Sequence, residues 1–434
     1  MEKLAINGGQ PVRKKPFPAY KVIGKEEKKA VARVLNTGLL SHYLGCWDKL
    51  FYGGPQVRAL EKEWAKYFKV KHALAVNSCT SGLYCAIGAS GVGPGDEVIV
   101  SPYTMSASAT SILIFNAVPV FADIEENYFC LDPKSVEKKI TKRTKAIVVV
   151  DLLGQPYDVE KINALAKKHQ LLVIEDCAQA PGAKYKNKYA GTLGDVGVFS
   201  LNYHKHIHTG EGGIVTTNND KLAEKVSLIR NHAEAVVGDK KVKNLVNMIG
   251  FNFRMTEIEA AIGRCQLRKL KKLLKKRLAN ANYLNQKLGA IPGITAPALR
   301  KNCTHVYYGH CFKYDEKIIG VSRQKFLKAV KAELAPTKMR EEEGILIGEG
   351  YGEPLYLQPL YQKQIAYGKD GCPFKCPFYK GKVNYQKGIC PVTERMYEKE
   401  VFTHDFMHSF IQKKDLDDVV KAFEKVYRLR KTIK

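Results

Sequence analysis

Long apolar runs are missing from this 434-residue chain, which has none long enough to cross a lipid bilayer. The first ten residues, from Met1 to Gln10, also lack the basic-then-apolar layout of a secretory signal. The eleven cysteines follow no regular spacing, and an odd count without a signal peptide favours free thiols over a disulfide framework. These absences predict a cytoplasmic protein with no membrane partner.

Acidic residues are scarce: 43 Asp and Glu stand against 70 Lys and Arg, which gives a net charge of +27. Nucleic-acid binding is not the favoured explanation, because the lysines are spread along the chain and rarely alternate with aromatic residues. The densest block, 264–277, places Leu267 and Leu270 between the charges, as in an amphipathic helix with a solvated basic face. A basic surface would also attract an anionic small substrate.

The chain is long enough for one large domain and one smaller domain, and 45% hydrophobic residues suffice for a sizeable core. Seven short apolar runs, separated by helix-sized segments, predict a mainly parallel sheet covered on both faces. They are 72–77, 97–101, 119–123, 146–151, 171–176, 196–200 and 213–217. Asp123, Asp151 and Asp176 close three of them, and ligands of such sheets bind at the carboxyl ends of the strands.

The sequence changes character after residue 250, where one or two long helices are predicted over 255–288. A strand over 304–308, a helix over 323–334 and a final amphipathic helix over 415–429 follow. We therefore expect a domain boundary near residue 262, with a large domain over 1–262 and a smaller α+β domain over 263–434.

Lys205 and Asp176 suggest a chemistry. Lys205 follows an apolar strand and a serine and precedes Gly210, Gly212 and Gly213, as a lysine that binds pyridoxal phosphate covalently would. Asp176 ends an earlier buried strand and could keep the cofactor's pyridine nitrogen protonated. Each residue alone has an ordinary interpretation, as a surface lysine or a buried aspartate bonded to backbone amides. The ordered pair predicts a catalytic site.

The segment 77–83 is the predicted phosphate anchor, because it follows a strand and opens a helix whose free N–H groups attract an anion. Thr80 and Ser81 could add hydroxyl donors, Ser200 is a third candidate, and Gln179 could contact the cofactor's ring hydroxyl. Taken alone, this segment is equally typical of an ordinary helix cap.

Two groups of residues have spacings that could hold a metal ion. His204, His206 and His208 alternate around Lys205, but no supporting Cys or carboxylate pattern accompanies them, and packing or substrate contacts are favoured. The second group is the cysteine tract, for which a structural zinc is the alternative to the favoured free thiols. Its members would be Cys372, Cys376 and Cys390, with His404 or His408 as a further ligand. No metal site is predicted.

The chain resembles the sugar aminotransferase family called DegT/DnrJ/EryC1/StrS over nearly its whole length. The resemblance rests on several motifs together, each of which is weak alone. They are 4–9, 93–99, 119–123, 154–156, Ile174-Glu-Asp-Cys-Ala-Gln-Ala180, Thr209-Gly-Glu-Gly-Gly213 and Gly250-Phe-Asn-Phe-Arg-Met-Thr-Glu257. It implies a fold-type I, aspartate aminotransferase-like architecture, with a mostly parallel central sheet and a smaller C-terminal α+β domain.

The resemblance also implies site residues and a partner. Asn252 would reach the cofactor phosphate of the neighbouring subunit in a homodimer, and Thr104 and Met105 would lie near the cofactor ring. The family usually has Phe at position 105 and Gly at position 79, where this chain has Met and Cys. The cysteine tract falls where the family carries a variable substrate-side loop.

The prediction is a pyridoxal phosphate-dependent aminotransferase that moves an amino group from glutamate or glutamine to a keto-sugar or a cyclitol ketone. Nucleotide-linked keto-hexoses are the leading acceptors, the opening 4–13 is similar to that of relatives acting on keto-inositols, and His305 is a weak candidate substrate contact. The product would feed surface polysaccharide, glycan or aminoglycoside synthesis. A related branch of sugar dehydratases has His where this chain has Lys205, which favours transamination over dehydration, the nearest alternative. A regulatory or nucleic-acid-binding homologue is the other.

Overall fold

A seven-stranded sheet forms the centre of the computed structural model, which describes residues 2–433. Its strands, in spatial order, are β1 (His72–Val76), β9 (Gly213–Thr217), β8 (Val196–Ser200), β5 (Leu172–Asp176), β4 (Thr144–Val150), β2 (Glu97–Val100) and β3 (Val118–Phe121). The strands from β8 to β3 are parallel, whereas β9 runs antiparallel to both of its neighbours. All seven predicted strands and the mainly parallel sheet are thus confirmed.

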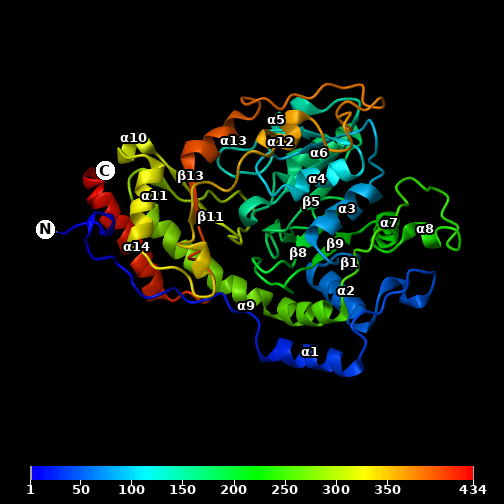
Figure 1. Cartoon of the computed structure of the whole chain (residues 1–434), viewed down its shortest axis with the longest axis horizontal. Coiled ribbons are helices and arrows are strands. Elements are labelled where there is room, and N and C mark those ends of the chain that lie inside the picture. Colours follow the sequence, from blue (N-terminus) through cyan, green and yellow to red (C-terminus); the bar gives the residue numbers. More distant parts are fainter. Residues whose placement is uncertain (1, 434) are drawn as a thin grey trace.

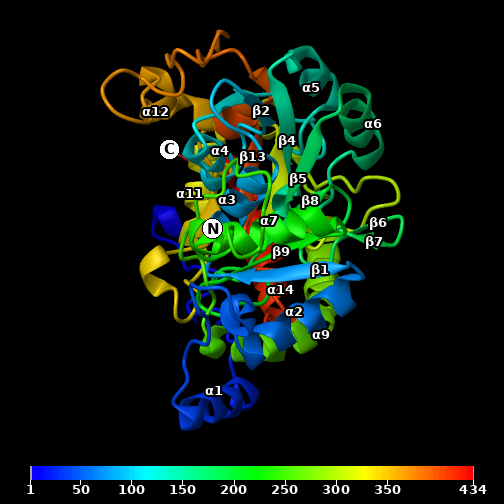
Figure 2. The ribbon, with the colours of Figure 1, turned by 90° about the vertical axis from the view of Figure 1, so that its right-hand side faces the viewer.

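Helices cover both faces of this sheet (Figures 1 and 2). Successive residues of a strand point to opposite faces, so Val98 and Val100 pack with one helical layer while Ile99 packs with the other. The first layer contains α3 (Cys79–Ala89), α4 (Ala107–Ile114) and α7 (Asp220–Arg230). The second contains α2 (Pro55–Phe68), α5 (Pro133–Lys139), α6 (Val159–His169) and the first half of α9 (Glu257–Leu288), against which α1 (Lys25–Thr37) packs.

A second, four-stranded antiparallel sheet lies in the C-terminal part, in the order β10 (Ile294–Thr295), β11 (His310–Tyr314), β13 (Val401–His404) and β12 (Ile347–Gly348). The last turns of α9, α11 (Arg323–Ala332) and α14 (Lys413–Arg428) build its core. The remaining short strands and α-helices are β6 (Lys184–Tyr185), β7 (Lys188–Tyr189), α8 (Ala233–Val236), α10 (Glu316–Ile319), α12 (Pro359–Lys363) and α13 (Pro391–Arg395). The expected boundary at residue 262 falls inside the single helix α9 and stays a prediction.

The strand predicted over 304–308 is wrong, because the ladder begins only at His310. Segment 304–308 forms its hydrogen bonds with loops of the first domain instead. The Val306 N–H donates to the Gly154 carbonyl (2.8 Å) and the Tyr308 N–H to the Leu153 carbonyl (2.7 Å). Alternating apolar side chains are compatible both with pairing to a neighbouring strand and with hydrogen bonding to a loop, so the sequence pattern could not distinguish these two arrangements.

Residues 349–393, here named the strap, leave the second sheet and return to the edge strand β3 (orange in Figures 1 and 2). Tyr356, Tyr361 and Tyr385 surround Phe121 with ring centroids 5.2 to 5.8 Å away. The Tyr385 hydroxyl donates to the Pro119 carbonyl (2.6 Å), which covers the open edge of the large sheet.

The strap also carries the cysteine tract. Cys376 and Cys390 are buried and Cys372 is half-buried, whereas His404 and His408 lie in the second domain, in and just after β13. Within residues 2–433, no three of these five side chains come together as a metal-binding group. No helix in this range is both long enough and apolar enough to cross a membrane.

Candidate active site

Three loops at the carboxyl edge of the large sheet bring the predicted site residues together. Asp176 is the last residue of β5, Ser200 is the last residue of β8, and Lys205 follows β8 in a turn whose Lys205 N–H donates to the Asn202 carbonyl (2.9 Å). The loop after β2 supplies Thr104. Because parallel strands end at one edge, residues far apart in the sequence meet there.

Asp176 is 5% exposed and is held by two donors. The Ser108 hydroxyl donates to its Oδ2 (2.7 Å) and the Ala178 N–H to its Oδ1 (3.1 Å). Burial raises the pKa of this carboxyl, while these two hydrogen bonds and the charge of Lys205 lower it. The donors therefore favour the ionised form inside a buried site.

Ser108 was not predicted from the sequence. It stands one residue into α4, is fully buried, and lies 3.1 Å from the Thr104 hydroxyl. Thr104 and Ser108 are four residues apart around the start of this helix, a spacing that places both side chains on one side. Thr104 was itself predicted to lie near the cofactor ring, so the four-residue spacing could have identified Ser108 from the sequence.

Lys205 is half-buried, and its Nζ lies 4.2 Å from the centre of the Tyr308 ring. An ammonium over an aromatic face is attracted by the ring's electrons, which gives this side chain a defined position. Cys79 lies beside the same groups: burial raises the pKa of its thiol well above the ordinary value, the Asp176 charge adds to this, and Lys205 opposes it. Lys205, Asp176 and the start of α3 therefore share one site.

The start of α3 has the shape of an anion cradle. Ser78 caps the helix, because its Oγ accepts the Ser81 N–H (3.0 Å). Gly213 begins β9 against this loop, where a Cβ would stand 2.6 Å from the Ser78 carbonyl carbon. Ser81 and Ser200 are nearly buried and Thr80 is half-buried. The Ser200 Oγ accepts the Asn202 N–H (3.2 Å), and its own hydroxyl proton is free to donate.

Gln179 is fixed by two contacts. Its Oε1 accepts the Leu153 N–H (2.6 Å), and its Nε2 donates to the hydroxyl of Tyr351 (2.6 Å). The backbone donor at Leu153 determines which end of the amide is oxygen. Tyr351 belongs to the strap, so this contact joins the C-terminal part of the chain to the carboxyl edge.

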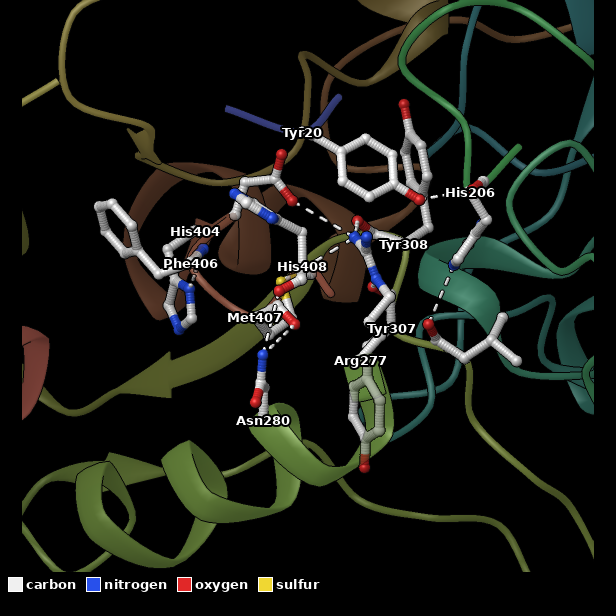
Figure 3. Close-up of polar contacts among 12 residues, drawn as sticks. Tyr20, His206, Arg277, Asn280, Tyr307, Tyr308, His404, Phe406, Met407 and His408 are labelled. Atoms are coloured by element: carbon white, nitrogen blue, oxygen red, sulfur yellow. Dashed lines mark hydrogen bonds and ion pairs between the residues drawn. The ribbon is translucent and has the colours of Figure 1, made fainter. Parts of the chain in front are cut away.

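Tyr308 is positioned from below by α9 (Figure 3). The Arg277 guanidinium donates through Nε to the Tyr307 carbonyl (2.6 Å) and through Nη2 to the Tyr308 carbonyl (2.8 Å). The Tyr20 hydroxyl donates to the His206 carbonyl (2.5 Å), and a His206 ring nitrogen lies 3.0 Å from the Val306 carbonyl. These contacts fix the segment that carries Tyr308 over Lys205.

A hollow of about 330 Å³ opens beside Tyr308 and Tyr351, between the carboxyl edge and the second domain. Its remaining lining is His204, Gly309, Arg340, Glu343, Ile345, Leu346, Ile347, Gly348, Thr403, His404 and Asp405. The Arg340 guanidinium bridges Asp405 (3.0 Å) and Glu343 (2.6 Å) across it. Burial, followed by the Arg340 charge, lowers the pKa of His204, so its imidazole is neutral near pH 7. The lining thus offers charged and neutral polar groups in a small space.

Four other predicted residues have different surroundings. Met105 is 64% exposed, and the Asn252 side chain faces solvent with its Oδ1 accepting from Arg254 (2.7 Å). His305 is buried, stacks on Tyr307 with centroids 4.0 Å apart, and does not line the hollow. His208 is half-buried, and its Nδ1 accepts the N–H of Gly210, two residues on in the same loop (3.3 Å).

Comparisons with known proteins agree with this architecture. Residues 22–374 match the DegT/DnrJ/EryC1/StrS aminotransferase family. The chain is 36% identical over 366 residues to the spore coat polysaccharide biosynthesis protein SpsC of Bacillus subtilis, across 83% of this chain and 88% of that protein. It is 32% identical over 443 residues to an L-glutamine:2-deoxy-scyllo-inosose aminotransferase of Micromonospora echinospora, across 98% of both.

A solved aminotransferase from Psychrobacter cryohalolentis superposes with a TM-score of 0.80 at 28% identity, over 95% of this chain and 99% of that one. The predicted fold-type I architecture is therefore confirmed. The family match, which spans most of the chain, leads to the same conclusion from the sequence: this protein belongs to the DegT/DnrJ/EryC1/StrS aminotransferase family and is an enzyme of that class.

Proposed function

We propose that this enzyme uses pyridoxal phosphate to move an amino group from glutamate or glutamine to the ketone carbon of a keto-sugar or cyclitol. One observation carries the proposal: Lys205 and the buried, hydrogen-bonded Asp176 converge beside a helix N-terminus and a polar hollow. SpsC and the inosose aminotransferase bear names of polysaccharide synthesis and cyclitol amination, which supports a polyhydroxylated acceptor.

The residues fit the cofactor. The first turn of α3 and the hydroxyls of Thr80, Ser81 and Ser200 would hold the phosphate, where Gly213 leaves space. Asp176 would pair with the pyridine nitrogen, Gln179 would contact the ring hydroxyl, and Thr104 and Met105 would lie along the ring. When bound, pyridoxal phosphate supplies a carbonyl carbon that carries the amino group and a ring that accepts electrons from the substrate.

Lys205 has two tasks in this proposal. Its amine would hold the cofactor covalently and, once released, would move a proton at the substrate's reacting carbon, which requires the amine to be neutral at that moment. The Tyr308 ring restricts the path of Nζ. Burial raises the pKa of Asp176 and the Ser108 hydrogen bond opposes this rise, so Ser108 would help the carboxylate to stabilise positive charge at its end of the site.

A homodimer completes the proposal, with Asn252 of each subunit reaching the cofactor phosphate of the other. Asn252 has a solvent-facing side chain, and exposed apolar residues gather in the loops before α2 and before α9. They are Leu39, Leu40, Leu44 and Trp47 in the first loop and Leu245, Val246 and Ile249 in the second. Exposed apolar side chains in such groups favour a protein partner. A cytoplasmic enzyme feeding surface polysaccharide, glycan or aminoglycoside synthesis fits these assignments.

Absorbance of the purified protein tests the proposal. With pyridoxal phosphate the wild type should show a band near about 410–430 nm that moves to shorter wavelength when glutamate or glutamine is added. Lys205→Ala should lack the band, whereas Lys62→Ala, a change on the exposed face of α2, should keep it. A band that does not change when either amino donor is added would favour sugar dehydration. The absence of a band, together with salt-sensitive retention of the protein on DNA, would favour a nucleic-acid-binding homologue without this activity.

A further inference from the structure

The strap supplies a tyrosine to the site that the aminotransfer proposal leaves without a task. Tyr351 stands at its beginning and lines the polar hollow beside Tyr308. Its N–H donates to the Tyr103 hydroxyl (2.8 Å), and the two rings meet edge to face at 5.8 Å. Tyr103 is fully buried and directly precedes Thr104. The carboxyl edge itself therefore positions the strap tyrosine.

The hydrogen-bonding roles at Tyr351 follow from its neighbour. Gln179 must turn its oxygen toward the Leu153 N–H, so its amide nitrogen donates to the Tyr351 hydroxyl. The Tyr351 hydroxyl oxygen thus accepts this hydrogen bond, and within residues 2–433 no other side chain accepts a hydrogen bond from the Tyr351 hydroxyl proton. Burial raises the pKa of Tyr351, and the nearby Tyr308 and Asp176 raise it further. The phenol stays protonated and keeps one unused donor at the hollow.

The cofactor does not need this donor. The Gln179 amide nitrogen donates one N–H to Tyr351, and its second N–H would be available to the cofactor's ring hydroxyl. Lys205, Asp176 and the start of α3 provide for the other cofactor groups. The hollow, in contrast, would hold the part of the substrate that extends beyond the reacting carbon, and a polyhydroxylated ring presents acceptor oxygens there.

We propose that Tyr351 is a specificity-determining residue, whose hydroxyl donates a hydrogen bond to the hydroxyl oxygen on a ring carbon next to the keto carbon of the amino acceptor. The proposal rests on the proposed aminotransfer. It assigns the donor half-reaction to the first domain and the discrimination of acceptors in part to the strap. An acceptor lacking that oxygen would leave the Tyr351 proton unpaired, which selects against it.

The test separates the two half-reactions in the full-length protein loaded with pyridoxal phosphate. The donor half is followed as conversion of the bound cofactor to its amino form by glutamate or glutamine. The acceptor half is followed in reverse, with 2-deoxy-scyllo-inosose or a nucleotide-linked 4-keto-hexose, whichever the wild type uses. Tyr351→Phe removes only the hydroxyl. Tyr397→Phe, a tyrosine just beyond the strap that does not line the hollow, is the control.

We expect Tyr351→Phe to lower kcat/KM for the acceptor by about 10- to 100-fold, the usual effect of one lost hydrogen bond to substrate, with the change mainly in KM. Its donor half-reaction and cofactor affinity should stay within about twofold of wild type. Tyr103→Phe removes the acceptor of the Tyr351 N–H and should produce a smaller loss in the same half-reaction.

Two results would overturn the inference. An unchanged acceptor half-reaction would mean that the hydroxyl touches no substrate. Equal losses in both half-reactions, or weaker cofactor binding, would mean that Tyr351 acts on the cofactor through Gln179. Failure of the proposed function is distinguishable from both, because then the wild type itself would show no donor half-reaction.

Discussion

Asp151 and Glu175 form a buried carboxyl pair whose single proton should set an alkaline limit on stability. Both side chains are 0% exposed. Asp151 Oδ1 accepts the Tyr157 N–H (3.0 Å), and Glu175 Oε2 accepts the Leu193 N–H (3.0 Å). Asp151 Oδ2 and Glu175 Oε1 have no other partner and face each other. Glu175 Oε2 also accepts the Gly194 N–H (3.3 Å), so Glu175 has the better-supported negative charge and we assign the shared proton to Asp151.

The sign of the effect follows from the direction of the shifts. Burial raises the pKa of both carboxyls, and the Glu175 charge raises that of Asp151 further. Unfolded carboxyls lose their protons near about pH 4. Above that pH the folded state retains a proton that the unfolded state has released, so stability falls as pH rises toward the folded pKa. One retained proton gives a slope of at most about 1.4 kcal/mol per pH unit.

Asp151→Asn tests this reasoning, because an amide N–H replaces the carboxyl proton with nearly the same shape while its oxygen still accepts from Tyr157. The urea midpoint of wild type and variant should be measured from pH 5 to 9 at fixed protein and cofactor concentrations. We expect the variant to gain stability relative to wild type as pH rises. Asp239→Asn, on an exposed loop, is the control. Parallel pH curves for wild type and Asp151→Asn would refute the shared proton.

Two further predictions concern the cofactor site. Ser108→Ala removes a hydrogen bond that lowers the pKa of Asp176. Activity should fall about 10- to 100-fold. In a profile of activity against pH, the acidic limb of the variant should lie at higher pH than that of wild type, while the control Ser106→Ala should leave it in place. An unmoved acidic limb would contradict this. Gly213→Ala would place a Cβ 2.6 Å from the Ser78 carbonyl. Cofactor affinity, measured by absorbance titration, should therefore drop at least about tenfold. The control Gly238→Ala, which has open space around the new Cβ, should bind the cofactor as wild type does.

The sequence predicted the parts of the site that one strand and its following loop determine. Asp176 and Lys205 each stand in a local pattern of apolar strand, polar end and glycine-rich turn. The carboxyl-edge rule then placed them together without any knowledge of distant contacts. The same reasoning gave all seven strands of the large sheet, since their Val- and Ile-rich runs reflect burial on both faces.

Residues contributed by the second domain could not be predicted in this way. Tyr351 meets Gln179 across 172 positions of sequence, and the contact depends on how the strap leaves the second sheet. Tyr308 depends on Arg277 and on loop carbonyls of the first domain, so its segment was mistaken for a strand. Such contacts leave no local periodicity, because each partner belongs to a different element.

The two pH limits predicted here have a common structural origin in β5. Its last residues, Glu175 and Asp176, are consecutive carboxyls, and the alternation of a strand sends their side chains to opposite faces. Asp176 meets Ser108 and Lys205, which favour its ionised form, while Glu175 meets Asp151, which must keep a proton. Lower pH should therefore act first on activity through Asp176. Higher pH should act first on stability through the pair behind it, and the Asp151→Asn and Ser108→Ala variants should each move only one of these limits.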